Sequence, residues 1–402
     1  MIVSSCNNSS QKQGQKNNDL DSSQKGSFGY DLKFLQQHDD SLVVLRNDSG
    51  KAQVIVSPKY QAKVFTSTAD NNNGTSFGWV NYKAFSGTPD AHMNAYGGEN
   101  RFWLGPEGGK YSLFFKPGDS MVFANWKTPA AFDTEPWSVT AKTGNSVTLK
   151  KDMHLENYKG TGLDVGVERT IKILSNTEIE KRTGLALDTS VKAVGYQTDN
   201  VITNNGKIAW TESTGMPCIW MLDMFTPSPS TVIVVPFKDL KGDPFNKIAT
   251  TNYFGEIPPD RLKHTDNMLF FKTDGKSRGK LGIVPAYAKP VAGSYDPKNK
   301  ILTVIMFDLD SSGKYLNQEW NTSKPTFSGD AVNAYNDGPL ADGTQMGPFY
   351  EMESVSPAAF LKPGQSLSHE HMVFHFTGNE KALDAISQKL LGVSLNDIQK
   401  EF

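Results

Sequence analysis

Residues 347–354 have the sequence Gly-Pro-Phe-Tyr-Glu-Met-Glu-Ser, which predicts a β-strand that begins after a Gly-Pro turn. Successive side chains of a strand point to opposite faces, so Glu351 and Glu353 lie on one face and Tyr350 and Met352 on the other. Two neighbouring carboxylates repel each other, which raises the pKa of one of them and suits general acid–base chemistry. The alternative is a strand whose acidic side faces solvent and has no catalytic role.

Short strands are predicted on both sides of this run and along most of the chain. Helical spacing is restricted to residues 30–35 and to the end, where Asn379 and Ser394 are candidate N-caps. Many strands without intervening helices predict an all-β fold, a large antiparallel β-sandwich with short C-terminal helices. We find no linker, so residues 29–402 are predicted to form one domain. The segments predicted as strands are residues 41–45, 53–56, 111–115, 120–124, 147–149, 168–174, 209–210, 231–235, 269–272, 301–307 and 372–376.

The composition of the 402 residues indicates which partners to expect. Charged residues make up 21% of the chain and the formal net charge is −2. Neither nucleic acid nor an anionic membrane surface is therefore an expected partner. No apolar run reaches the roughly 18 residues of a membrane-spanning helix. The composition does not determine the oligomeric state.

The first 28 residues differ from the rest of the chain. The run Val-Ser-Ser-Cys at residues 3–6 resembles a bacterial lipobox, in which the cysteine, here Cys6, receives the lipid. The residues that follow are almost wholly Asn, Ser, Gln, Lys, Gly and Asp, which predicts a flexible tether. We expect residues 1–28 to be a truncated lipoprotein signal with a tether. The protein is then exported and anchored by lipid in the envelope of a Gram-negative bacterium, in the periplasm or at the outer membrane. The alternative is an accidental Ser-Ser-Cys.

A glycine-rich stretch at residues 96–109 is the most distinctive motif. Its polar and aromatic side chains are suited to sugar recognition, because indole faces stack on sugar rings while carboxylates, amides and guanidinium groups bond hydroxyls. The alternative is a structural bulge in which Glu99 and Arg101 form an internal ion pair. The candidate binding residues are Glu99, Asn100, Arg101, Trp103 and Glu107.

Two further segments raise the question of a metal ion. Alternation along a strand puts His369, His371 and His375 on one face, and the first two are close enough to share a metal. The favoured interpretation is a polar outer face over a buried aromatic face. Residues 333–339 form a turn-rich loop whose Asn336 and Asp337 could bind a sugar or, less in keeping with their spacing, a calcium ion. No cofactor is expected other than this calcium ion.

The end motifs resemble a known superfamily. The glycine-rich stretch, together with the Phe-Tyr-Glu-Met-Glu-Ser run and the later Leu-Lys-Pro-Gly-Gln-Ser, looks like galactose-mutarotase-like proteins. Within that superfamily it looks closest to an uncharacterised family of Bacteroides-type secreted lipoproteins. The resemblance implies a β-supersandwich with a sugar-sized cleft, in which Glu351 or Glu353 matches the general base. The central histidine acid of mutarotases has no counterpart, although His264 or His92 could replace it.

Three functions remain open at this point. The first is an exported carbohydrate-binding protein whose ligand is a mono- or oligosaccharide, with Arg278 as a scattered additional candidate for binding. The second is an enzyme of the aldose 1-epimerase type with a C-terminal glutamate base. The third is a glycoside hydrolase or lyase that sets Glu99 or Glu107 opposite the C-terminal glutamates.

Overall fold

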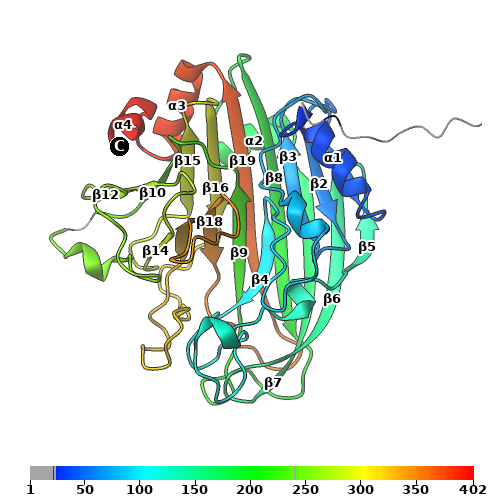
Figure 1. The fold of residues 1–402 in the computed structure, drawn as a ribbon, viewed down its shortest axis with the longest axis vertical. Helices are drawn as coiled ribbons and strands as arrows, with labels where there is room; N and C mark the ends of the chain where they lie inside the picture. Colours follow the sequence, from blue (N-terminus) through cyan, green and yellow to red (C-terminus); the bar gives the residue numbers. More distant parts are fainter. Residues whose placement is uncertain (1–20, 22–23, 240) are drawn as a thin grey trace, which may run out of the picture.

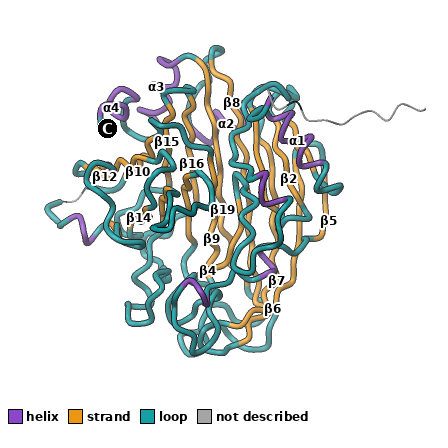
Figure 2. The backbone as a smooth tube through the Cα atoms, in the orientation of Figure 1, coloured by secondary structure: helices purple, strands orange, loops and turns teal. Residues whose placement is uncertain are grey.

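A computed structural model describes residue 21, residues 24–239 and residues 241–402 of the chain. Cys6 and most of the expected tether lie outside these residues. The described chain folds as two large layers of antiparallel strands, with helices at the periphery (Figures 1 and 2). The predicted all-β sandwich with short C-terminal helices is confirmed.

The first layer is a ten-stranded sheet in which every neighbouring pair is antiparallel. Several of its strands are long, and burial alternates along β7, as expected where one face packs on the core and the other meets solvent. The order across the sheet is β12 (Leu262–His264), β13 (Met268–Lys272), β10 (Val232–Pro236), β15 (Val291–Asp296), β16 (Ile301–Phe307), β19 (Ser366–Gly378), β8 (Val191–Asn204), β7 (Gly162–Ile173), β6 (Ser146–Glu156) and β5 (Ser138–Lys142).

The second layer is a six-stranded sheet extended by a three-stranded one. The two sheets meet where Val64 bridges Asn100 in an antiparallel manner. The six-stranded order is β11 (Ala249–Thr250), β14 (Gly279–Ile283), β17 (Val332–Asn336), β18 (Tyr350–Val355), β9 (Cys218–Phe225) and β4 (Arg101–Gly105), and the three-stranded order is β1 (Val43–Arg46), β2 (Gln53–Ser57) and β3 (Lys63–Thr68).

The six-stranded sheet is buried on both faces. Every residue of β4, β9, β17 and β18 is buried. One face packs on the ten-stranded sheet. The segments that connect the strands contain four short 3-10 helices, η2 (Tyr82–Phe85), η3 (Phe123–Asn125), η4 (Ala130–Phe132) and η5 (Phe245–Lys247). Polar side chains on the other face are therefore held away from bulk water.

The helices begin at capping side chains. α1 (Phe28–Gln36) begins after Ser27, whose hydroxyl accepts a bond from a backbone N–H of the first turn. α2 (Asn176–Thr183) has a capping box formed by Ser175 and Glu178. The predicted caps at Asn379 and Ser394 begin α3 (Glu380–Leu390) and α4 (Leu395–Lys400). No helix in the described residues is long and apolar enough to span a membrane.

Several local predictions were wrong. Residues 111–115 and 209–210 are not strands, and residues 120–124 contain a turn and the start of η3. Their apolar side chains are used for packing rather than for strand pairing, as at the buried Phe114 and Trp210. Conversely, residues 333–336 of the predicted loop belong to β17, which pairs with β14 on one side and β18 on the other.

Candidate functional site

The face of the six-stranded sheet that is turned away from the ten-stranded sheet carries a charged and aromatic cluster. Directly paired residues share a face of a sheet. The register aligns Arg101 on β4 with Glu353 on β18 across one residue of β9. It also aligns Glu351 with Lys280 on β14 through Tyr335 of β17. Three strands, β4, β14 and β18, thus contribute charged groups to one surface, as the alternation predicted for Glu351 and Glu353 requires.

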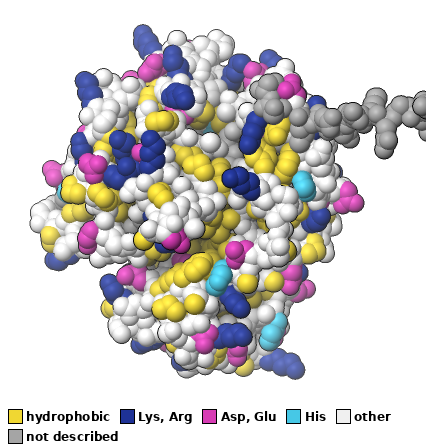
Figure 3. Space-filling view, viewed as in Figure 1, with side chains coloured by type: hydrophobic (Ala, Val, Ile, Leu, Met, Phe, Trp, Pro, Cys, Tyr) yellow, Lys and Arg dark blue, Asp and Glu magenta, His cyan; other side chains and the backbone are white. Residues whose placement is uncertain are grey.

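Two connected cavities open onto this surface. An inner pocket of about 110 Å³ reaches Arg101, Trp103, Lys280 and Glu351. A larger outer cleft of about 790 Å³ continues from it. Both cavities are lined by Met93, Glu107, Phe123, Trp126, Phe254, Arg278, Trp320, Tyr335 and Met346. The face drawn in Figure 3 is hollowed near its middle, with hydrophobic side chains around the hollow. We refer to the two together as the sheet cleft.

Two ion pairs form the floor of the sheet cleft. The Arg101 guanidinium pairs with the Glu351 carboxylate. Lys280 Nζ donates to Glu353 Oε2 at 2.9 Å, and the Trp220 indole N–H donates to the same oxygen at 2.8 Å. All four charged side chains of these pairs are less than a tenth exposed. Buried charges are retained only where they are paired and hydrogen-bonded, so the floor is a preorganised polar surface.

Burial shifts the protonation of this floor. It raises the pKa of Glu351 to about 7, a rise that Arg101 opposes and the nearby Glu353 strengthens. It also raises the pKa of Glu107, while Lys280 partly offsets the effect. Burial by itself would lower the pKa of Lys280, but the carboxylates of Glu353, Glu107 and Glu351 raise it above its usual value. Lys280 therefore stays charged, while Glu351 can exchange a proton near neutral pH.

Some polar atoms of the floor and wall lack a hydrogen-bond partner among the described residues. They are Arg101 Nε, Trp126 Nε1 and Glu353 Oε1. Arg101 and Trp126 line the inner pocket. A buried donor or acceptor without a partner costs on the order of 1–3 kcal/mol. Arg101 and Trp126 therefore bring hydrogen-bonding groups without a protein partner to the lining of the inner pocket.

Aromatic rings form the wall above this floor. Trp103 and Trp220 meet edge to face, with ring centroids 5.5 Å apart. Trp126 and Trp320 lie nearly parallel, with centroids 6.0 Å apart. Aromatic faces beside a few hydrogen-bonding groups are typical of sites that hold a ring with one apolar face and polar substituents.

The glycine-rich stretch divides between the two faces of the sheet. Arg101, Trp103 and Glu107 lie in the sheet cleft. Glu99 and Asn100 instead face the interior between the two layers. Glu99 Oε1 accepts bonds from Ser67 at 2.7 Å and from the His375 ring at 3.0 Å. Asn100 donates to Asp223 Oδ1 at 2.6 Å and accepts a bond from Arg169. The expected Glu99–Arg101 pair is not formed, because Glu99 precedes β4 and bonds to Ser67 and His375 in the interior, while Arg101 pairs with Glu351 in the sheet cleft.

The C-terminal histidines also face this interior, which corrects the expectation of a polar outer face. The Ser354 hydroxyl lies 2.8 Å from His369 Nε2 and 2.8 Å from His371 Nδ1. His371 Nε2 lies 2.7 Å from Asp223 Oδ2. The three histidines are at most 1% exposed. Their hydrogen bonds join the two layers. Among the described residues, no group of three or more His, Cys, Asp or Glu side chains is arranged to hold a metal ion.

The remaining candidates are dispersed. His92 and Asp337 line the outer cleft, and Arg278 lines both cavities. His264 is exposed on the edge strand β12 and stacks on Phe245 with centroids 3.8 Å apart, away from the sheet cleft. Asn336 is buried and accepts a bond from the Gly275 N–H at 2.9 Å, a contact that holds a loop.

The family comparison gives this chain a family without a known function. A model for a family of unknown function, DUF6786, matches residues 26–402. The chain belongs to the DUF6786 family. No curated protein matches the sequence significantly.

Solved structures show an overall likeness at low identity. A candidate aldose 1-epimerase from Escherichia coli K12 is 12% identical, with a TM-score of 0.49, over 84% of this chain and 99% of that one. A galactose mutarotase-like protein from Lactobacillus casei is 11% identical, with a TM-score of 0.47, over 83% and 100%. A galactose mutarotase-related enzyme from Lactobacillus acidophilus is 10% identical, with a TM-score of 0.44, over 84% and 97%. At these values the likeness assigns no role to any residue of this DUF6786 protein.

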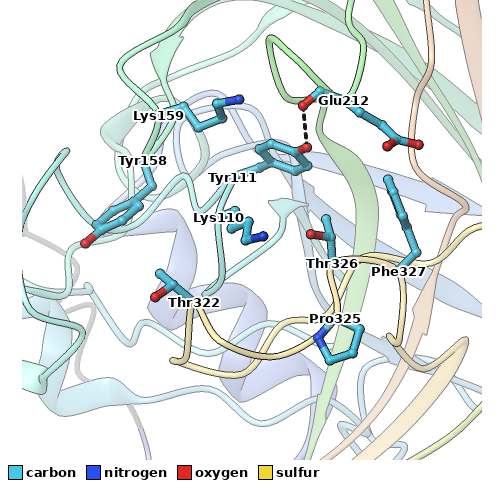
Figure 4. A pocket seen from close by; sticks show the side chains of 9 residues that line it. All are labelled: Lys110, Tyr111, Tyr158, Lys159, Glu212, Thr322, Pro325, Thr326 and Phe327. Carbon is cyan, nitrogen blue, oxygen red and sulfur yellow. Dashed lines mark hydrogen bonds between the residues drawn. The ribbon is translucent and has the colours of Figure 1, made fainter.

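A second hollow of this DUF6786 protein differs in character from the sheet cleft (Figure 4). Its volume is about 730 Å³, and Lys110, Tyr158, Lys159 and Phe327 line it. The one hydrogen bond drawn there joins the Tyr111 hydroxyl to the Glu212 carbonyl at 2.6 Å. None of its lining side chains is among the buried polar groups without a partner. The sheet cleft is therefore the stronger candidate site.

Sequence reasoning did not single out Lys280, Trp220, Trp126 or Trp320 as members of one site. Lys280 lies in the run Gly-Lys-Leu-Gly-Ile, and a lysine inside an otherwise apolar strand is the signal that could have marked it. The tryptophans carry no such signal, because most tryptophans of a β-sandwich belong to its core. Only the tertiary fold separates those of the sheet cleft from the others.

Proposed function

We propose that this protein binds a carbohydrate in the sheet cleft. The observation that supports this most directly is the combination of aromatic walls with polar groups that lack a partner, Arg101 Nε and Trp126 Nε1, in one pocket. A sugar ring offers an apolar face for the indoles and hydroxyl groups that both donate and accept hydrogen bonds. A purely apolar ligand would leave these polar atoms without partners, which is costly in a buried site.

The charged floor favours a ligand that carries hydroxyl groups. Arg101 and Lys280 are each already paired with a carboxylate, so no buried cation of the floor is left free for an anionic group. Carboxylates that accept and cations that donate, side by side, are suited to a row of hydroxyls, since each hydroxyl can bond to both.

Saturation-transfer NMR on residues 24–402 with a panel of neutral monosaccharides and short glycans tests this proposal. We expect transfer to at least one sugar, and its loss in Trp126→Ala. Trp137→Ala is the matched control, because Trp137 is buried outside the sheet cleft and its indole donates to the Ala131 carbonyl. Absence of transfer to every member of the panel would refute carbohydrate binding.

A second candidate function is proton transfer at the anomeric centre of the bound sugar. It is favoured by the raised pKa of Glu351, about 7, since a general base works best when its pKa is near the working pH. Ionised Glu351 would take the proton of the anomeric hydroxyl. Glu107, whose pKa burial also raises, would give a proton to the ring oxygen as the bond from that oxygen to the anomeric carbon breaks. Reclosure of the open-chain aldehyde on either face interconverts the anomers and returns both protons.

The same NMR samples test this chemistry. Freshly dissolved sugar is followed until its anomers reach equilibrium, with and without protein. We expect accelerated exchange that Glu351→Gln abolishes while saturation transfer persists. Binding without acceleration would leave a binding protein, and release of new reducing ends would indicate hydrolysis.

We further propose, from the sequence around Cys6 and the polar segment after it, that the protein is exported and anchored by lipid. Labelling of the protein with a radioactive fatty acid when it is expressed from its native gene in a Gram-negative host, compared with Cys6→Ser, tests this point. Unlabelled protein in the cytoplasm would refute it.

A further inference from the structure

We propose that the sheet cleft binds the end of a neutral oligosaccharide of two or more sugar units, with the terminal unit in the inner pocket and the following units in the outer cleft. This inference rests on the proposed carbohydrate binding and specifies its ligand class. The size of the two cavities, the exposed rings at the mouth and the charges along the outer cleft support it.

The two cavities differ greatly in size. The inner pocket, about 110 Å³, has the charged floor and room for no more than one sugar ring. The outer cleft, about 790 Å³, lies within the range of about 300–1,000 Å³ that is usual for small-ligand sites. A monosaccharide on the charged floor would leave the outer cleft empty. A chain of sugars that enters by its end would fill both.

Large hydrophobic side chains stand exposed around the outer cleft. Phe123 is 61% exposed, Leu340 47%, Met346 43% and Phe254 37%, and all four line this cleft. They are half of the eight exposed large hydrophobic residues in the described chain. Exposed apolar groups that gather at a cavity mark a binding surface.

The rings on one side of the outer cleft are nearly parallel. Phe123 lies between His92 and Trp126, with centroid separations of 4.5 Å and 6.1 Å and interplanar angles of 25° and 19°. From another part of the chain, Phe254 carries the Arg278 guanidinium 3.8 Å from its ring centroid. Phe123 and Phe254 thus present exposed aromatic surface at two separate points of the outer cleft, which is suited to successive sugar rings because every pyranose has an apolar face.

The charges of the outer cleft favour a neutral chain. Arg278 is the one lysine or arginine among its described lining residues. The carboxylates lining it are Asp90, Glu107, Glu319, Asp337 and Asp342. A glycan with a negative charge on every unit would meet repulsion along this cleft, whereas hydroxyl groups donate readily to carboxylates.

Calorimetric titration of residues 24–402 with glucose, mannose and xylose and with their β-1,4-linked dimers to tetramers, and with the α-1,4-linked glucose series, tests the inference. Oligogalacturonides provide the anionic comparison. We expect one series to bind at least ten times more tightly as the trimer than as the monosaccharide. Phe123→Ala and Phe254→Ala should raise the Kd of the trimer by a larger factor than the Kd of the monosaccharide.

The outcomes separate the two proposals. If a monosaccharide binds and its Kd does not change with chain length, or if the two variants weaken the monosaccharide as much as the trimer, the oligosaccharide inference fails and carbohydrate binding stands. Tighter binding of oligogalacturonides than of every neutral series would overturn the neutral class. If no sugar binds, carbohydrate binding itself fails. Because both phenylalanines are exposed, their replacement should leave the fold intact, and unchanged thermal unfolding would verify this.

Discussion

The Lys280 ammonium lies 2.9 Å from Glu353 Oε2 on a sheet face where the two side chains are 7% and 0% exposed. Replacing one partner leaves the other as an uncompensated buried charge, which costs about 3–5 kcal/mol. We therefore expect Lys280→Met to lower the free energy of unfolding by about that amount, and Lys280→Met with Glu353→Gln to lower it by less. Chemical denaturation of the three proteins measures both values.

A surface pair serves as control for this prediction. Lys314 and Glu212 are also 2.9 Å apart, but both side chains are 57% exposed. Exposed pairs contribute about 0–1 kcal/mol, so Lys314→Met should have little effect. Equal destabilisation by Lys280→Met and Lys314→Met would show that burial does not strengthen the Lys280–Glu353 pair.

Glu351 should make stability depend on pH in a defined window. Its pKa in the folded protein, about 7, is above the 4.5 of an exposed glutamate. Between these values the folded protein keeps a proton that the unfolded chain has released, so its contribution to stability is fully present below about pH 4.5 and is lost as the pH rises to about 7. Unfolding of the wild-type protein and of Glu351→Gln is measured from pH 4 to 8. The free energy of unfolding of the wild type minus that of the variant should decrease as the pH rises across that window. A difference that does not change with pH would contradict the raised pKa.

The sequence predicted the fold class better than it predicted the site. Alternation along residues 350–354 was enough to put Glu351 and Glu353 on one face. The burial of that face could not be predicted, because no local sequence pattern indicates the loops that cover it. The same alternation separates Asn100 from Trp103, whereas Glu99 is separated from Arg101 because it precedes β4 and bonds to Ser67 and His375 in the interior. Sequence analysis grouped these four residues as one binding motif because it weighed their chemistry and not the face on which each lies.

The histidine strand shows a second limit. Alternation correctly grouped His369, His371 and His375, but it could not tell an exposed polar face from a buried one. Whether the histidine face is exposed or buried depends on hydrogen-bond partners far away in the chain. These partners are Ser354, Asp223 and Glu99, which lie inside the sandwich. Polar side chains can occupy an interior only when such partners exist, and a single sequence does not show them.

Cys218 should be unreactive in the folded protein. Burial raises the pKa of its thiol to about 12, and the side chain is 0% exposed. Since the thiolate is the reactive form, Cys6→Ser protein should react with a thiol reagent at pH 8 only after unfolding in denaturant. Spectrophotometric titration of the thiol checks this, and rapid reaction without denaturant would show that the thiol is accessible.

The indole N–H of Trp126 should contribute to affinity separately from its ring. In the described protein this N–H has no hydrogen-bond partner, although the side chain is only 7% exposed. Trp126→Phe removes the donor and keeps an aromatic face. A hydrogen bond contributes about 0.5–1.5 kcal/mol, so the Kd for the sugar that binds should rise by roughly 2–10-fold, with little loss of stability.

Trp137→Phe is the control for this prediction, because the Trp137 N–H donates to the Ala131 carbonyl at 3.0 Å in the core. Its loss should lower the free energy of unfolding and leave the Kd unchanged. Calorimetric titration and denaturant unfolding of both variants separate the two effects. An unchanged Kd in Trp126→Phe would show that the ring alone serves the ligand, and the polar contact assigned to this wall would have to come from Arg101.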